Sequence, residues 1–316
     1  NRKIIMKNRL KKKIITKAKS TGSKKEPSPE KKKGIYSSKN ILNDLTGTEW
    51  IQETTTIWYQ RGLGQTHEHA QIEKEHPAPF PYSMVERLVK FFTKKDGLVL
   101  DPFCGVASTL KACALNERKG IGIELSQKWV NLSKKRLKEE VTDSSQQKII
   151  KGDSRKVLDK LDKESIDFVV TSPPYWQILS KPADHKVTKE RIEKNLDTKY
   201  SVSKDDLGNI ENYDEFLKEL KIICKKCFGL LKDGKYMVIV VSDFRHKSKY
   251  IPFHSDVSVM MEECGFDTKS MSILVQNAKK LFPYGYPYDF VPNIHHQFIL
   301  IFKKPKKIKN KKNAKK

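Results

Sequence analysis

Three acidic residues and one serine each follow a short apolar run of the kind that forms a β-strand. They are Asp101, Glu124 and Asp153, which close the runs 97–101, 120–124 and 148–153, and Ser172, which follows the run 166–171. An acidic residue after a single strand is often only a helix cap. In a doubly wound parallel sheet, however, ligands bind beyond the carboxyl ends of the strands. Four polar strand ends in succession therefore predict one binding site.

The turn after the first run favours a particular ligand. Residues 101–109 contain one glycine, Gly105, where a dinucleotide-binding loop has three, and they lack the lysine of a phosphate-binding P-loop. An amino-acid end of a ligand suits this turn and the helix N-terminus that follows. Glu124 can accept hydrogen bonds from ribose hydroxyls, and Asp153 can accept one from an adenine amino group. Adenosine with an amino-acid tail is S-adenosylmethionine, which we expect as the cofactor.

Ser172, Pro173, Pro174 and Tyr175 form the sharpest motif. Two prolines fix the backbone after the strand and remove two N–H donors. The loop then presents acceptors, the Ser172 hydroxyl oxygen and the Pro173 carbonyl, which suit an NH2 group. Tyr175 adds a flat face on which a base can stack.

The elements around these residues alternate between strand and helix. Helices are expected at 108–116, 127–141, 154–162, 212–231 and about 254–263, and further strands at 235–242, 267–275 and 295–302. This order predicts an α/β fold with a doubly wound, mostly parallel, Rossmann-like sheet. The last two strands have no helix between them, so we expect them to form an antiparallel hairpin at the sheet edge.

Charge is concentrated at the two ends of the 316-residue chain. The formal net charge is +25, of which residues 1–40 carry +13 and residues 303–316 carry +9. We interpret both ends as disordered basic tails that anchor to phosphate backbones. The chain lacks a long apolar run of the kind that spans a membrane or forms a signal peptide, so we expect a cytoplasmic protein that is not secreted.

The cysteines indicate packing rather than chemistry. There are five, and Cys224 and Cys227 share one expected amphipathic helix with no second CxxC pair. A structural zinc site needs two more ligands, so we expect packed, reduced thiols and no metal site.

The motifs, taken in order, resemble the amino-methylating DNA methyltransferases, which modify cytosine N4 or adenine N6. The matching segments are NDLTGTEW (43–50), HPAPFP (76–81), LDPFCGVAST (100–109), GIGIE (120–124), KGD (151–153) and TSPPYW (171–176). The resemblance covers residues 41–302 and implies a methyltransferase domain over that range, with 41–96 as a part that covers the cofactor. The cofactor-binding residues it implies are Phe80, Pro81, Asp101, Pro102, Phe103, Gly105, Ser108, Glu124, Leu125 and Asp153.

The resemblance also implies the reaction. Hydrogen bonds from the amine to Ser172 and to the Pro173 carbonyl favour direct methyl transfer to a flipped-out base without a covalent intermediate. Serine at this position leans toward cytosine N4, and adenine N6 is the alternative. Methylation of an RNA base or of protein glutamine, and a noncatalytic DNA-binding protein, are less favoured readings.

Two departures from the family pattern lead to further expectations. Ala107 stands where the family has glycine, so we expect the loop to use backbone angles that are ordinary for alanine. In the family arrangement with this motif order, a large C-terminal recognition domain often follows, whereas the given sequence ends at Lys316. We therefore expect recognition to use insertions, with residues 177–210 and 277–293 as the candidates. The aromatic residues of 277–293 form either a packed loop or a DNA-reading surface. Candidate DNA contacts are Trp176, Arg245, Lys247, Lys279 and Lys280. The expected partners are double-stranded DNA and a cognate restriction endonuclease.

Overall fold

The computed structural model describes residues 34–60, 72, 75–76, 80–178, 203–277 and 279–307. Residues Ile35–Lys316 form one compact unit. Most of both predicted basic tails lies outside the described residues, and so does most of the candidate recognition insertion 177–210.

The described residues include a few that the sequence pattern placed in the two tails. Asn40 was assigned to the tail, but its side-chain oxygen accepts hydrogen bonds from the backbone of Leu42 at 3.0 Å and Asn43 at 3.1 Å. Lys304 was also assigned to a tail, but it is buried, and its ammonium group donates to the Leu231 carbonyl at 2.7 Å. A lysine-rich composition hides these local partners, so the sequence pattern placed both residues in the tails although each makes defined contacts with the domain.

Within the described part of the chain, the main sheet has eight strands in the order β1-β9-β10-β6-β5-β2-β3-β4. Their bounds are β1 (Ile57–Tyr59), β2 (Leu98–Asp101), β3 (Lys119–Glu124), β4 (Gln147–Lys151), β5 (Ile166–Thr171), β6 (Leu231–Val241), β9 (Asp267–Val275) and β10 (His296–Lys303). Only β10 runs against its neighbours, β6 and β9, and every other pair is parallel. The predicted doubly wound, mostly parallel sheet is confirmed. The predicted hairpin β9–β10 is also present, but the short strand β1, which the sequence pattern missed, lies outside it at the edge.

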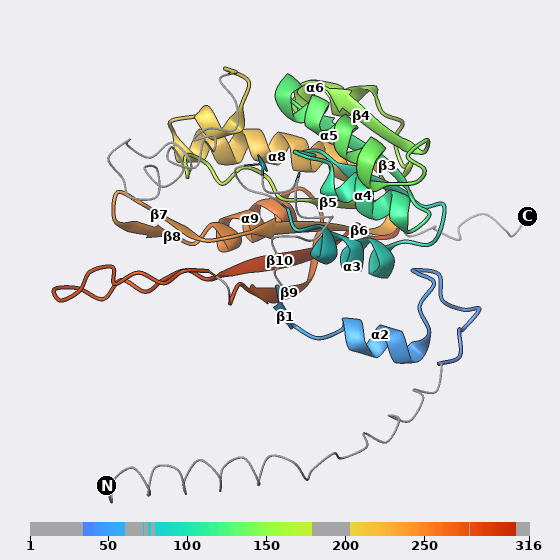
Figure 1. Ribbon diagram of the computed structural model, residues 1–316, viewed down its shortest axis with the longest axis horizontal. Coiled ribbons are helices and arrows are strands. Elements are labelled where there is room, and N and C mark those ends of the chain that lie inside the picture. The colour runs from blue at the N-terminus through green and yellow to red at the C-terminus, as the bar shows by residue number, and fades with distance from the viewer. Residues whose placement is uncertain are drawn as a thin grey trace, which may run out of the picture. The chain divides into compact units, whose positions relative to one another are not determined.

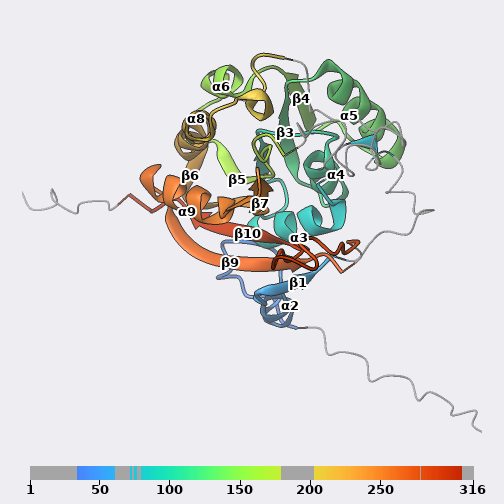
Figure 2. The same ribbon diagram turned by 90° about the vertical axis from the view of Figure 1, so that its left-hand side faces the viewer.

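Helices cover both faces of this sheet (Figure 1). Their bounds are α2 (Gly47–Glu53), α3 (Tyr82–Phe92), α4 (Ser108–Leu115), α5 (Gln127–Glu140), α6 (Ser154–Val157), α8 (Tyr213–Leu230) and α9 (Phe253–Glu263), with the 3-10 turns η3 (Leu158–Lys160) and η4 (Leu207–Asn209). Figure 2 shows α3, α4 and α5 along one side of the strands and α6, α8 and α9 along the other.

Side-chain alternation along the strands builds the two cores. In β6, Val238 and Val240 pack with α3, whereas Ile239 and Val241 pack with α8 and α9. Successive side chains of a strand point to opposite faces, so one central strand serves both layers.

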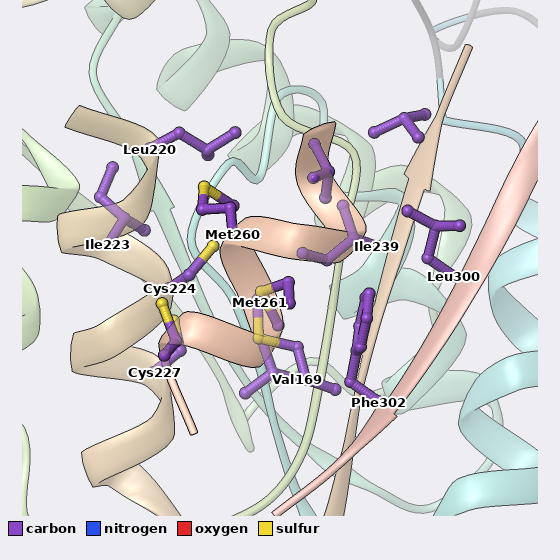
Figure 3. Packing of buried hydrophobic residues seen from close by; sticks show 14 of the residues in the cluster. Val169, Leu220, Ile223, Cys224, Cys227, Ile239, Met260, Met261, Leu300 and Phe302 are labelled. Carbon is purple, nitrogen blue, oxygen red and sulfur yellow. The ribbon is translucent and has the colours of Figure 1, made fainter. Parts of the chain in front are cut away.

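The thiols of the CxxC pair belong to the second core. Cys224 and Cys227 face Met260 and Met261 of α9 (Figure 3), and both cysteines are buried. Burial raises the pKa of the Cys224 thiol well above its ordinary value. The predicted packed-thiol reading is confirmed.

Topology brings several connections to one edge of the sheet. Strands β5, β2, β3 and β4 are adjacent and parallel, so the residues after them lie side by side as predicted. Because β10 is antiparallel to β6, with Phe298 paired to Val241, the β9–β10 connection also leaves from this carboxyl edge.

A small hairpin follows β6 at the same edge. Strands β7 (Phe244–His246) and β8 (Lys249–Ile251) pair antiparallel. The turn residues Lys247 and Ser248 have φ values of 47° and 68°, as a two-residue hairpin turn with matching twist requires. The sequence pattern did not predict this hairpin.

Candidate active site

Asp101 joins the first turn to the end of β5. Its carboxylate accepts hydrogen bonds from the Phe103 backbone at 3.0 Å and from the hydroxyls of Thr109 at 2.5 Å and Thr171 at 2.7 Å. The side chain is buried, and burial raises the pKa of the carboxyl group, an effect that these hydrogen bonds oppose. Because Thr171 directly precedes Ser172, Asp101 links two segments that are named here after their predicted roles: the cofactor turn (residues 101–109) and the catalytic loop (residues 172–175).

The cofactor turn uses left-handed backbone conformations. Gly105 has φ 52°, and Ala107 has φ 61° and ψ 34°. The expectation of ordinary angles at Ala107 is therefore wrong. A left-handed alanine costs roughly 1–2 kcal/mol. Here the residue is fully buried, its N–H bonds to the Cys104 carbonyl, and its carbonyl accepts the Lys111 N–H, so tertiary packing and the start of α4 compensate for the strain.

Helix α5 supports this turn from behind. The Ser133 hydroxyl donates to the Gly105 carbonyl at 2.7 Å. The Arg136 guanidinium donates to the Val106 carbonyl at 3.1 Å and to the Ser108 hydroxyl oxygen at 2.9 Å. Ser108, a predicted cofactor contact, is thus buried and directed toward α5.

Glu124 is the carboxylate of the site that keeps access to solvent. It is half-buried, and each oxygen accepts one backbone hydrogen bond, from Gly105 at 3.0 Å and from Ser126 at 2.7 Å. Burial raises the pKa of Glu124 to about 7, and the neighbouring acids Asp206 and Asp101 also raise it. A carboxylate oxygen has more than one lone pair, so both oxygens can still accept from the hydroxyls of a ribose.

The other residues predicted to bind the cofactor divide by exposure. Phe80, Pro81, Phe103 and Leu125 are half-buried, whereas Pro102 and Asp153 are buried. Asp153 lies two residues beyond the end of β4 rather than within it, and caps α6 by accepting from the Arg155 backbone at 2.9 Å. The Arg155 side chain also binds this carboxylate at 3.0 Å. An adenine amino group would therefore share Asp153 with Arg155.

His76 lies against the glycine of the turn. A Cβ built on Gly105 would lie 3.4 Å from the His76 ring, and that ring packs edge-on against Trp129 with centroids 4.8 Å apart. The described part of the segment expected to cover the cofactor is thus next to the turn. Residues 77–79 lie outside the described residues.

The catalytic loop is held by the hydroxyl of Tyr175. Ser172 Oγ lies 3.1 Å from this hydroxyl, which donates to the Val240 carbonyl at 3.3 Å and accepts from Gln297 Nε2 at 3.0 Å. Pro173 is buried, and Ser172, Pro174 and Tyr175 are half-buried.

Trp176 does not lie on the surface. It is 7% exposed, its indole N–H donates to the Ile210 carbonyl at 2.8 Å, and its ring packs against Tyr213. A side chain buried in this way is not placed to contact DNA, which argues against the prediction for Trp176. Residues 203–210, the C-terminal end of the predicted 177–210 insertion, pack beside Trp176. Leu207 belongs to the same hydrophobic core, so this end of the insertion is part of the domain body.

The basic candidates gather at two neighbouring segments of the carboxyl edge. Arg245 lies in β7, and its guanidinium donates to the Pro292 carbonyl at 3.0 Å, which ties the hairpin to the β9–β10 connection. Lys247 is exposed at the hairpin turn, and Lys279 and Lys280 are exposed in the connection.

Residues 279–293, here called the aromatic arm, do not pack into the core. Three of their aromatic side chains are 81–94% exposed: Tyr286, Tyr288 and Phe290. Aromatic residues of the arm line an open hollow of about 550 Å³. Of the two readings left open by the sequence, the packed loop is wrong and an exposed surface is found.

Three residues of this edge escaped the sequence analysis as parts of the site. Asp206 lies near enough to Glu124 to raise its pKa. Asp243, just after β6, accepts from the Tyr250 hydroxyl at 2.5 Å and the His254 backbone at 3.0 Å, so it orients the hairpin. Gln297 is the third, through its hydrogen bond to the Tyr175 hydroxyl. An acid at a strand end is the pattern that indicated Asp101, and it also applies to Asp243, whereas no sequence pattern marks Gln297.

Within the described ranges, no group of three or more His, Cys, Asp or Glu side chains is placed to hold a metal ion. No helix among the described residues is long and apolar enough to cross a membrane.

Comparison with known proteins gives short matches to individual relatives. The chain is 36% identical over 75 residues to the orphan methyltransferase M.BamHII of Bacillus amyloliquefaciens (23% of this chain, 28% of that protein). It is 31% identical over 104 residues to the type II methyltransferase M2.MboI of Moraxella bovis (33% and 36%). The matched stretches thus span about a quarter to a third of these relatives.

The chain also resembles a solved structure and matches a family profile. The putative DNA modification methylase TTHA0409 of Thermus thermophilus, complexed with S-adenosyl-L-methionine, is 28% identical with a TM-score of 0.34, covering 52% of this chain and 56% of that one. The profile of the N6_N4_Mtase family, described as DNA methylase, matches residues 3–135 and 166–316. That match spans the cofactor turn, the catalytic loop and the aromatic arm, and the chain belongs to this DNA methylase family.

Proposed function

We propose that this protein is an S-adenosylmethionine-dependent DNA methyltransferase that modifies the exocyclic N4 of cytosine. The observation that carries the proposal is the Asp101 network. It ties a ligand-binding turn after β2 to an acceptor loop after β5, and family membership makes a DNA base the natural substrate.

The residues at the carboxyl edge fit the cofactor chemically. Glu124 offers carboxylate acceptors for ribose hydroxyls, and Gly105 leaves room beside His76 that any Cβ would enter. Phe103 lies two residues before Gly105, and Leu125 directly follows Glu124. Both side chains are half-buried and offer apolar surface. When bound, S-adenosylmethionine supplies an activated methyl group on a sulfonium sulfur.

Ser172 and the Pro173 carbonyl position the target amine. The lone pair of an exocyclic amine is delocalised into the base, so the nitrogen is a poor nucleophile. Hydrogen bonds donated by the amine to these two acceptors favour a tetrahedral nitrogen with a lone pair free to react. Positioning of this kind can contribute several kcal/mol. Tyr175 provides the stacking face, and the amine proton leaves to water after transfer.

The aromatic arm and the β7–β8 hairpin form the proposed DNA surface. Arg245, Lys247, Lys279 and Lys280 supply positive charge that can contact phosphates. The exposed aromatic side chains of the arm can stack on bases that leave the helix. Both segments leave the sheet at the edge that holds Ser172, so a flipped base could enter while the duplex stays on this surface.

The choice of cytosine N4 rests on Ser172, and adenine N6 is the second candidate. Aspartate at this position leans toward adenine, and the hydroxyl here lacks the charge of that group. The type II name of the M2.MboI relative supports a cognate restriction endonuclease as a partner.

Nucleoside mass spectrometry tests the proposal directly. DNA lacking methylation is incubated with the purified protein and methyl-labelled S-adenosylmethionine, and a parallel reaction contains RNA of matched sequence. Labelled N4-methylcytosine from DNA is the expected product. Labelled N6-methyladenine would refute the base assignment and keep the enzyme class, and label in RNA alone would refute a DNA substrate.

A further inference from the structure

Gln297 reaches the catalytic loop from a distant part of the chain. It lies at the second position of β10, 122 residues from Tyr175, and its side-chain amide donates to the Tyr175 hydroxyl at 3.0 Å. Strand β10 is separated from β5 by β6 in the sheet, so this contact crosses a whole strand. The proposed reaction does not yet use Gln297.

Two neighbouring glutamines orient this amide. Gln276 Nε2 donates to Gln60 Oε1 at 2.9 Å and to Gln297 Oε1 at 3.4 Å. Because the Gln297 oxygen faces an N–H group, its own nitrogen must face Tyr175.

The partners of Tyr175 then determine where each proton lies. A hydroxyl has one proton and two lone pairs. The Val240 carbonyl can only accept, so it takes the tyrosine proton. The Gln297 nitrogen can only donate, so it takes one lone pair. The remaining lone pair faces Ser172, which must therefore donate its own proton to Tyr175.

This arrangement determines what Ser172 offers to a ligand. With its proton directed to Tyr175, the serine oxygen keeps both lone pairs free. It accepts from an NH2 group and repels the carbonyl oxygen that thymine or uracil carries in the place of the amine.

We propose that Gln297 is a positioning residue: by ordering the Tyr175 hydroxyl, it holds Ser172 as a hydrogen-bond acceptor and so selects a base that carries an amine. The proposal rests on the proposed function and names a specificity device within the same site.

A double-mutant cycle on methyl transfer tests the coupling. The variants are Gln297→Leu, Tyr175→Phe, which keeps the ring, and the double variant, with Gln127→Leu on the surface of α5 as the matched control. One lost hydrogen bond corresponds to a fall of about 3- to 10-fold in kcat. We expect each single variant to show such a fall with little change in KM for DNA, and the double variant to be no slower than Tyr175→Phe. If the two single effects multiply in the double variant, Gln297 does not act through Tyr175 and the proposal is overturned.

A spectroscopic readout separates this proposal from the proposed function. In protein labelled with ¹³C at the tyrosine ζ-carbon, the Tyr175 resonance is the one absent from Tyr175→Phe. Gln297→Leu should shift this resonance and Gln127→Leu should leave it in place. A resonance unmoved by Gln297→Leu overturns the proposal. If wild-type protein methylates no DNA while the resonance moves, the proposed function fails and the ordering of Tyr175 by Gln297 stands.

Discussion

The pKa of Glu124 leads to a quantitative expectation for cofactor binding. In the free protein, burial favours the protonated carboxyl group and raises its pKa to about 7. Ribose hydroxyls donate to the ionised form, so bound cofactor lowers this pKa. Binding must therefore release a proton, and affinity must rise with pH through the range near 7.

The size of the effect follows from the ionised fraction. With a pKa of about 7, roughly one carboxyl group in eleven is ionised at pH 6 and roughly ten in eleven at pH 8. If the ionised form alone binds the ribose, the dissociation constant falls about tenfold from pH 6 to pH 8. The logarithm of the dissociation constant changes most steeply with pH below pH 7.

Isothermal titration calorimetry with S-adenosylmethionine measures both quantities. Dissociation constants are taken at pH 6, 7 and 8, and two buffers with different ionisation enthalpies count the protons released. Glu124→Gln should bind more weakly at pH 8 and lose this component of the pH dependence. Titration of the ligand amino group is common to both proteins and cancels in the comparison.

An exposed acid provides a second control. Glu211→Gln changes the same functional group on the surface and should retain the wild-type pH dependence. Equal slopes for wild type and Glu124→Gln, or a wild-type dissociation constant that is flat from pH 6 to pH 8, would refute the assignment of Glu124 to the ribose.

Three further predictions concern other parts of the site. Ser172→Ala should remove most methyl transfer while the cofactor dissociation constant in calorimetry stays the same, and equal turnover would contradict the role of Ser172 as amine acceptor. Ala107→Val should lower the free energy of unfolding in urea by at least about 2 kcal/mol, because a β-branched side chain must take a left-handed conformation at a buried position. Ala107→Gly should change it by less than about 1 kcal/mol, since relief of strain offsets the lost methyl burial. Deleting residues 1–40 should weaken DNA binding and flatten its dependence on salt in fluorescence anisotropy, whereas an unaltered salt slope would show that the basic segment does not contact phosphates.

Local sequence patterns predicted most of the central strands and helices and the order of the site, but missed the short elements α2, β1, β7 and β8. Period-two and period-3.6 apolar spacing reflects which side chains face the core, so strands such as β5 and helices such as α5 were predicted to within a residue. Parallel strands end at one edge of a sheet, so the topology places the polar residues that follow them side by side. This explains why Asp101, Glu124 and Ser172 follow strands that end at the same edge of the sheet.

Contacts between distant segments required the tertiary structure. The left-handed conformation of Ala107 depends on support from α5 and on the start of α4, and a propensity rule for alanine contains neither. Trp176 looks like a surface aromatic beside the motif, but Tyr213 and the Ile210 carbonyl bury it.

Gln297 shows the difference most clearly. A glutamine near a strand end has no distinctive spacing, and its role appears only when the register of β10 against β6 brings it to Tyr175. The sequence by itself determined which strands carry the acids and the acceptor loop, because that information is local. The hydrogen-bond partners that orient the reacting groups were decided by strand register and helix packing, which join residues far apart in the chain.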